Sequence, residues 1–257
     1  MMTIVKRWLL AFLVPKPIVG MLYLPRYLRH WFEYRAMALS DTRPEWRDSY
    51  PCLTVWYPST PFDPHYFYQG AWLARHLTLT KPTLHVDIGS SAMMLSVMSA
   101  QVRTVFVDYR PLRAGLEDLI CLAGNALRLP FATESLPSLS SLHVLEHVGL
   151  GRYGDALDPL GSVKAAVEFT RVVSPGGRLY VSVPTGRDRT CFNAHRVFSP
   201  ATLQRMFPGL ELESFALVDD RGSYLSTAEP EDGEKLDYGC GMYVFVKPDV
   251  SARLAGA

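Results

Sequence analysis

Two acidic residues lie in or at the end of consecutive apolar segments, and a turn of small residues stands between them. Asp87 lies in segment 83–88, and Asp108, 21 positions later, ends segment 104–108. The turn Gly89-Ser90-Ser91-Ala92 would let a ligand approach the backbone and the N–H groups of a helix N-terminus. A carboxylate about 20 residues beyond such a turn can accept hydrogen bonds from both ribose hydroxyls of a nucleoside. Either acid alone could be a helix cap, but the pair indicates a nucleoside-containing ligand.

A second group of polar residues follows the third apolar segment, 141–145. His147 is a candidate general base because its ordinary pKa lies near neutrality, and Glu146 could orient it or contact the ligand. The nearby loop 149–155 offers Tyr153 and Asp155 as substrate contacts.

Two more candidates follow the fourth segment, 178–184. His195 is a second candidate base, and the Arg196 guanidinium could bind a phosphate or carboxylate. Each histidine could equally be a hydrogen-bonded structural residue.

The residues 143–147 also match H-x-x-E-H, the inverted zinc-peptidase signature. That motif needs both histidines on one helical face. The surrounding pattern indicates a strand end, where positions four apart do not share a helical face. We therefore set zinc chemistry aside and expect no metal.

Strands and helices must alternate to position these residues. Asp63 and Pro64 predict a capped helix over 65–77, and a later helix ends within 168–173. Residues 211–218 and 241–247 predict a closing antiparallel pair. This order is typical of an α/β fold, a Rossmann-like, doubly wound, mostly parallel sheet covered on both faces. Ligands bind such sheets at the carboxyl ends of the strands, where the candidates lie.

One loop before the third strand adds a possible adenine contact. Residues 124–131 read Gly-Asn-Ala-Leu-Arg-Leu-Pro-Phe. Asn125 could accept from the exocyclic amine and donate to a ring nitrogen, although an ordinary turn asparagine fits as well.

Together these motifs resemble class I S-adenosylmethionine-dependent methyltransferases, in particular the small DUF268 group. The resemblance covers roughly residues 62–248, and residues 63–70 are most like that group. It rests on Val86-Asp87-Ile88-Gly89-Ser90, Val107-Asp108-Tyr109-Arg110, the loop 124–131, Leu145-Glu146-His147 and Pro175-Gly176-Gly177-Arg178-Leu179.

The resemblance implies S-adenosyl-L-methionine as cofactor. The residues expected around it are Asp87, Gly89, Ser90, Asp108, Tyr109, Asn125, Ala126 and His143. Two departures from the family pattern concern the glycine loop, where Ser91 and Met93 replace later glycines. Met93 would either crowd the methionine portion of the cofactor or point into the core. Asn125 stands where Asp is common.

Methyl transfer from a sulfonium needs mainly alignment, with a base where the acceptor must lose a proton. The resemblance suggests cell-surface glycan assembly, with a sugar hydroxyl as acceptor. A small metabolite or lipid acceptor remains open. The alternative from another class is a non-catalytic scaffold that keeps the fold.

Composition and the N-terminal residues bound the remaining possibilities. The 26 Lys and Arg balance 25 Asp and Glu, which argues against nucleic-acid binding through bulk charge. Four cysteines without a CxxC pair favour a reduced, cytoplasmic setting.

Residues 1–35 are basic and aromatic, as expected for contact with the inner membrane surface or for packing against a domain. The apolar run 8–14 is too short to span a bilayer. We predict an extension and connector over 1–61, a methyltransferase-like domain over 62–248 and a tail over 249–257.

Overall fold

The structure is a computed structural model that describes residues 17–249. The apolar run 8–14 and nearly all of the predicted tail lie outside these residues. Contacts divide the chain into two compact units, Met1–Phe62 and Asp63–Ala257.

The first unit is built on helix α2 (Pro17–Met37) and a short 3₁₀ turn, η1 (Trp46–Asp48). Trp56 anchors the returning chain on α2: its ring lies 5.4 Å from Tyr23, and the Arg26 guanidinium stacks over it at 3.4 Å. Segment 38–62, part of the expected connector, is irregular apart from η1. Among residues 17–249, no helix is long and apolar enough to cross a membrane.

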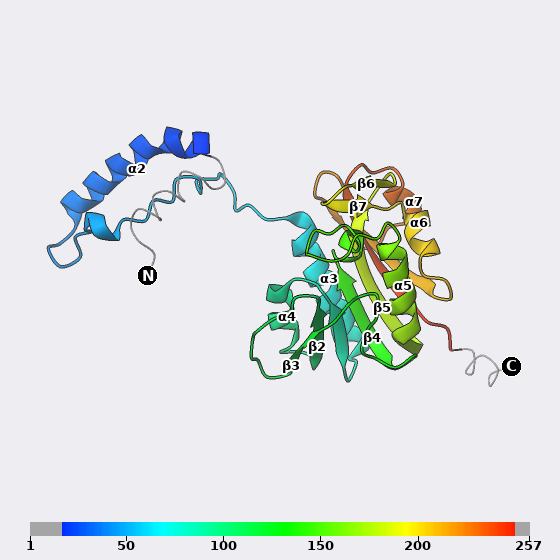
Figure 1. The fold of residues 1–257 in the computed structure, drawn as a ribbon. Coiled ribbons are helices and arrows are strands. Elements are labelled where there is room, and N and C mark those ends of the chain that lie inside the picture. Colours follow the sequence, from blue (N-terminus) through cyan, green and yellow to red (C-terminus); the bar gives the residue numbers. More distant parts are fainter. Residues whose placement is uncertain (1–16, 250–257) are drawn as a thin grey trace. The chain divides into compact units, whose positions relative to one another are not determined.

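The second unit is organised around one eight-stranded sheet, in the order β3-β2-β1-β4-β5-β10-β8-β9 (Figure 1). Strands β1 to β5 pair in parallel, whereas β10 runs antiparallel between β5 and β8. A separate hairpin joins β6 and β7. The strands are β1 (His85–Ile88), β2 (Thr104–Asp108), β3 (Leu119–Ala123), β4 (Leu136–Leu142), β5 (Val173–Thr185), β6 (Arg189–Cys191), β7 (His195–Val197), β8 (Glu211–Val218), β9 (Tyr224–Leu225) and β10 (Gly239–Val246). The predicted α/β class with a closing antiparallel pair is confirmed.

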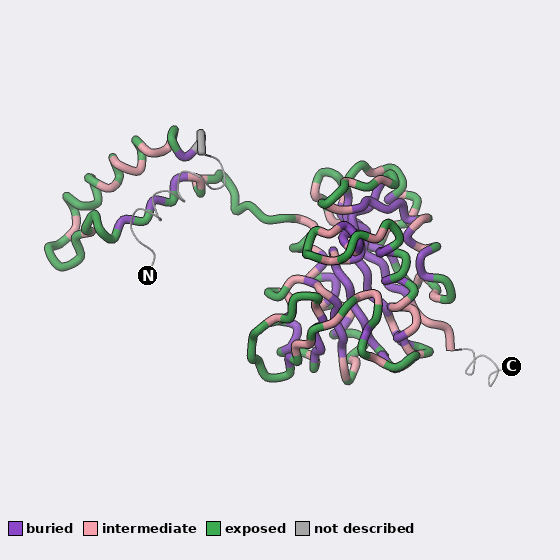
Figure 2. The backbone as a smooth tube through the Cα atoms, in the orientation of Figure 1, coloured by how far each residue is buried: buried purple, intermediate pink, exposed green. Residues whose placement is uncertain are grey.

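Helices cover both faces of this sheet, so its strands form the buried interior (Figure 2). Phe169 of α5 packs with Val181 and Tyr243 on one face. Trp72 of α3 packs with Tyr180 and Val244 on the other. The helices are α3 (Pro64–Thr80), α4 (Ala92–Met98), α5 (Gly161–Val172), α6 (Pro200–Arg205) and α7 (Pro230–Gly233).

The start of α3 follows from its first residues. Asp63 Oδ1 accepts hydrogen bonds from the backbone N–H groups of His65 at 2.9 Å and Tyr66 at 3.3 Å. Pro64 occupies the first turn, where a missing N–H costs nothing. This cap places His65 and Tyr66 at the helix N-terminus.

Several elements differ from the sequence prediction. The third predicted strand, β4, spans Leu136–Leu142 instead of 141–145, because His143 turns to the left-handed conformation at φ 53° and ends it. Residues Leu145–His147 then form a 3₁₀ turn, η2. Strand β5 begins at Val173 rather than 178. Strands β3, β6, β7 and β9 are not among the predicted strands.

Candidate active site

Asp87 lies beneath the site as part of a buried polar chain between β1 and β4. It accepts a hydrogen bond from the Ser140 hydroxyl and another from the Ser90 N–H at 3.0 Å. His85 contacts Ser140 Oγ at 2.9 Å and Ser138 Oγ at 2.8 Å. Burial raises the pKa of Asp87 to about 6 and lowers the pKa of His85 to about 3, because both charged forms are poorly solvated there.

Gly89, two residues after Asp87, keeps space open between Val144 and Asp108. Its φ is +69°, and a Cβ there would lie 3.0 Å from Val144 Cγ1 and 3.7 Å from Asp108 Oδ2. Asp108 Oδ1 accepts from the Arg110 N–H at 2.6 Å. A side chain at position 89 would thus intrude between the end of β4 and the second oxygen of Asp108.

The predicted adenine loop follows β3. Asn125 Oδ1 accepts from the Leu127 N–H at 2.9 Å, so this oxygen serves the turn. The residue also lines the same cavity as Ala126 and the half-exposed Tyr109. Gly124 is required for packing, since a Cβ would lie 2.3 Å from Val107 Cγ1.

Glu146 lies between two histidines and is 1% exposed. Its Oε1 is 2.8 Å from His143 Nδ1 and 3.6 Å from His147 Nε2. His147 Nδ1 donates to the Ala194 carbonyl at 2.7 Å, so in the neutral ring Nε2 carries the lone pair. Burial lowers the pKa of His147, with the neighbouring Glu146 opposing this.

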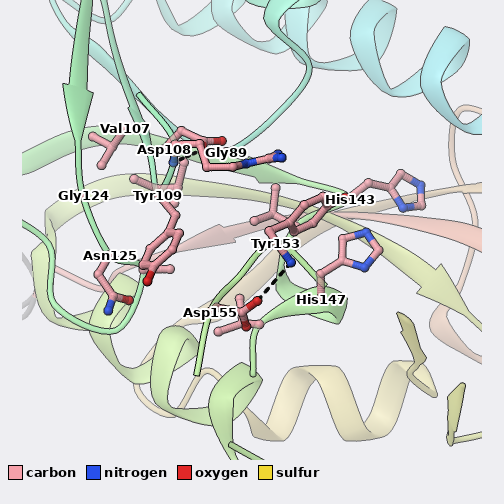
Figure 3. A pocket seen from close by; sticks show the side chains of 15 residues that line it. Gly89, Val107, Asp108, Tyr109, Gly124, Asn125, His143, His147, Tyr153 and Asp155 are labelled. Atoms are coloured by element: carbon pink, nitrogen blue, oxygen red, sulfur yellow. Dashed lines mark hydrogen bonds between the residues drawn. The ribbon is translucent and has the colours of Figure 1, made fainter. Parts of the chain in front are cut away.

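Tyr153 and Asp155 come from the loop after η2. Asp155 organises the loop by accepting from the N–H groups of Gly149 at 2.7 Å and Tyr153 at 3.3 Å. The Tyr153 ring lies beside His147, with ring centroids 5.6 Å apart (Figure 3). The Arg110 guanidinium stacks on the Tyr153 ring at 4.5 Å.

These residues line a cavity at the carboxyl ends of β1 to β4, partly open to solvent, which we call the carboxyl-edge cavity (Figure 3). Nine of the sequence-predicted site residues line it: Gly89, Asp108, Tyr109, Asn125, Ala126, His143, His147, Tyr153 and Asp155.

Five other predicted residues are not in the lining. Asp87 and Glu146 are buried behind it. The Ser90 hydroxyl is also buried and accepts from the Leu142 N–H at 2.9 Å, joining the ends of β1 and β4. His195 packs against Tyr238, with ring centroids 5.1 Å apart.

The structure gives Arg196 a different role from the predicted contact with an anionic substrate. The residue is only 8% exposed, and one guanidinium nitrogen donates to the Val148 carbonyl at 2.7 Å and to the Ser162 hydroxyl at 2.8 Å. The other approaches the carbonyls of Asp158 and Pro159 at 3.4 Å. These bonds hold the loop after η2 and leave no room for an external anion.

The expectation that Met93 points into the core is wrong. It is 83% exposed at the start of α4 and neither fills the cavity nor enters the core. The altered glycine loop therefore leaves the cavity open.

Sequence reasoning missed several neighbours of the predicted residues. Arg110 stacks on Tyr153, and Val144 and Val148 form apolar walls. His65 and Tyr66 stack on His143 with ring centroids 5.3 Å away. The predicted helix cap at Asp63 places His65 and Tyr66 in the first turn of α3. No local sequence pattern indicates that this turn lies against His143, which follows β4.

The fold is that of class I S-adenosylmethionine-dependent methyltransferases. Three similar solved structures cover 71–72% of this chain at 15–16% identity and a TM-score of 0.50. They are the N-methyltransferase NodS of Bradyrhizobium japonicum with S-adenosylhomocysteine, 88% covered; the Burkholderia thailandensis 1,6-didemethyltoxoflavin-N1-methyltransferase, 79% covered; and YcgJ of Bacillus subtilis, 99% covered. At this identity the likeness establishes the fold alone.

The family described as "Caenorhabditis protein of unknown function, DUF268" matches residues 130–236, which confirms the resemblance to that methyltransferase-like group. The match begins before β4 and ends before β10, so residues 63–70 lie outside it. No curated protein matches this chain significantly by sequence.

Proposed function

We propose that the second unit binds S-adenosylmethionine in the carboxyl-edge cavity and transfers its methyl group to an acceptor. The observation that carries the proposal is the convergence of Gly89, Asp108 and Asn125 from three strand ends on one cavity. Their order along the chain follows the nucleoside-binding pattern of such sheets.

Two features of the cavity lining suit this cofactor. The space above Gly89 is one that a Cβ would fill, and the second oxygen of Asp108 faces it. Asp108 would accept from the ribose hydroxyls, while Asn125 and Tyr109 would contact the adenine. When bound, the cofactor supplies a methyl group already activated on its sulfonium.

His147 would take the proton that the acceptor loses. The bond from Nδ1 to Ala194 orients the ring, and the lowered pKa keeps it neutral near pH 7. Glu146, 3.6 Å from Nε2, would stabilise the imidazolium that forms. Tyr153, against His147, would position the acceptor.

We further propose a hydroxyl acceptor, specifically a sugar hydroxyl of a cell-surface glycan. The base at His147 suits a hydroxyl, and aromatic rings such as Tyr153 and Tyr66 suit stacking on a sugar face. The resemblance stated from the sequence adds the glycan setting. A scaffold without catalysis is the alternative if cofactor binding fails.

The test of cofactor binding is calorimetric titration with S-adenosylhomocysteine. Asp108→Ala should weaken binding by about 1–3 kcal/mol, roughly 5- to 150-fold, because a charged acceptor is lost. Glu117→Ala removes an exposed acid outside the cavity lining and should leave affinity unchanged. Absence of binding to folded protein, or equal affinity in both variants, would contradict the proposal.

We also propose that the first unit contacts an anionic membrane surface. Large apolar side chains of α2 are at least 65% exposed, namely Met21, Leu22, Phe32 and Met37. Arg29 and Arg35 lie on the same helix. Phe32→Ser with Met37→Ser should lower partition onto phosphatidylserine vesicles at least tenfold, at about 1.5–3 kcal/mol for each buried side chain. Leu79→Ser, on α3, is the matched control, and equal partition of all three proteins would refute contact through α2.

A further inference from the structure

A cluster of three metal-ligating side chains lies beside the carboxyl-edge cavity, contributed by three elements far apart in the chain. His65 comes from the first turn of α3, His143 follows β4, and Cys240 lies at the start of β10. One ligand atom from each lies within 4.8 Å of the other two. No residue of this cluster has a role in the cofactor site beyond the wall that His143 provides.

His143 has an unused nitrogen in this cluster. Its side chain is 5% exposed, and its buried Nε2 makes no well-formed hydrogen bond, although the Cys240 thiol lies close enough to interact with His143. A buried nitrogen without a well-formed hydrogen bond is costly, so it favours a ligand at this place.

Glu146 determines which nitrogen of His143 is left for a ligand. Its Oε1 lies 2.8 Å from His143 Nδ1, and a carboxylate accepts, so Nδ1 carries the proton and Nε2 is the nitrogen left for a ligand. A carboxylate that orients a histidine for a metal through its other nitrogen is a recurrent arrangement in metal sites. The left-handed backbone at His143, with φ 53°, holds the ring at this place.

One ion shared by both histidines requires a change in the orientation of His65. His65 and His143 stack with ring centroids 5.3 Å apart and an interplanar angle of 7°. A metal ion lies in the plane of each imidazole that binds it, so His65, half-buried at the start of α3, turns out of this stack on binding. Cys240 is fully buried and supplies the soft third ligand.

We propose that His65, His143 and Cys240 form a zinc site with three protein ligands and a fourth position left for water or another small ligand. On binding, the Cys240 S–H bond breaks and a sulfur–zinc bond forms; the thiol proton, and any proton on His143 Nε2, pass to solvent. The site joins the N-terminus of α3 to the ends of β4 and β10, and it fixes the wall of the carboxyl-edge cavity at His143.

This set differs from the H-x-x-E-H reading of residues 143–147. His147 does not join it, because its Nδ1 donates to Ala194 and its Nε2 faces Glu146. Of the residues in this motif, only His143 is a ligand, and Glu146 orients His143 by accepting from its Nδ1. The proposal is independent of methyl transfer, since it concerns metal affinity alone.

The experiment is a zinc titration of the chelator-treated full chain, monitored by competition with a chromophoric chelator. Cobalt(II) substitution gives a second readout, the thiolate-to-cobalt charge-transfer absorption. We expect one equivalent of zinc, and a cobalt spectrum with this band in the unmodified chain.

Variants at each ligand separate the site from adventitious binding. His65→Gln and Cys240→Ser should weaken zinc binding more than 100-fold, and Cys240→Ser should abolish the charge-transfer band. Glu146→Gln should weaken binding by about 10- to 100-fold, as for lost orienting partners. His76→Gln and Cys121→Ser, which lie outside the cluster, are the matched controls.

The proposal is overturned if folded protein, checked by circular dichroism, binds no stoichiometric zinc. It is also overturned if His65→Gln binds as tightly as His76→Gln. His65 is only half-buried at a helix N-terminus, so its variant keeps the test decisive if Cys240→Ser does not fold.

Discussion

Replacement of Asp87 by asparagine should remove one source of pH dependence from the free energy of unfolding, so the difference in stability between the variant and the parent should grow as the pH rises. Asp87 is fully buried, and burial raises its pKa to about 6 from an ordinary 3.8. The neutral acid is therefore favoured in the folded state, despite the hydrogen bonds from Ser140 and Ser90 that partly offset the penalty.

The magnitude follows from this shift of about two pKa units, which corresponds to about 3 kcal/mol at 1.36 kcal/mol per unit. Below the ordinary pKa the carboxyl is neutral in both states, so its stabilising contribution is fully present. That contribution declines as the unfolded chain ionises and is lost once the pH has risen through about 6, where the folded chain ionises too. The amide in the Asp87→Asn variant does not ionise, so the variant should gain about 3 kcal/mol relative to the parent between about pH 4 and pH 7.

Urea unfolding of both chains from about pH 4 to pH 7.5 measures the difference. Loss of the carboxyl contact with Ser140 changes the free energy of unfolding by the same amount at every pH. The prediction is therefore tested by how the difference between the two chains changes with pH. Glu117→Gln, at an exposed acid, should give a flat difference. A flat difference for Asp87→Asn would show that folding does not shift the pKa of Asp87, and the opposite slope would show that the folded site stabilises the carboxylate; either result would refute the reasoning.

Two further predictions concern the cavity. Gly89→Ala should weaken S-adenosylhomocysteine binding more than tenfold, because the new Cβ would lie 3.0 Å from Val144 Cγ1. Gly154→Ala is the control: its φ of +86° imposes the same backbone strain, but no atom lies within 4 Å of the new Cβ, so this variant should bind S-adenosylhomocysteine normally. Equal affinities by calorimetry would remove Gly89 from the cofactor site. His147→Gln should lower turnover on a hydroxyl acceptor by about 10²- to 10⁴-fold while S-adenosylhomocysteine affinity stays within threefold. In the parent chain, turnover should fall only below pH 6.5, since the pKa of His147 is lowered from that value. If His147→Gln loses S-adenosylhomocysteine affinity in parallel with turnover, His147 acts in binding and not as a base.

The parts of the site that were predictable from the sequence depend on local order. A strand, a turn of small residues, a helix and a second strand place Gly89 and Asp108 at one edge whatever the rest of the chain does. The spacing between the acids is therefore informative. The same holds for the cap at Asp63, where all partners lie within three residues.

The parts that were not predictable depend on distant partners. Arg196 is surrounded by carbonyls of residues 148–159, and no side-chain pattern marks such acceptors in a sequence. Met93 points outward because α4 begins at Ala92, one position before it. Cys240 reaches His143 only because β10 inserts beside β5, a pairing set by the whole sheet.

The placement of β10 also governs how the chain can be made. This last strand of the described residues pairs with β5 on one side and with β8 on the other, so each of these neighbours lacks a partner on that side until residue 246 has been synthesised. During synthesis, β5 presents an open, apolar edge that can pair with other chains. We therefore expect incomplete products that end before residue 239 to accumulate as aggregates.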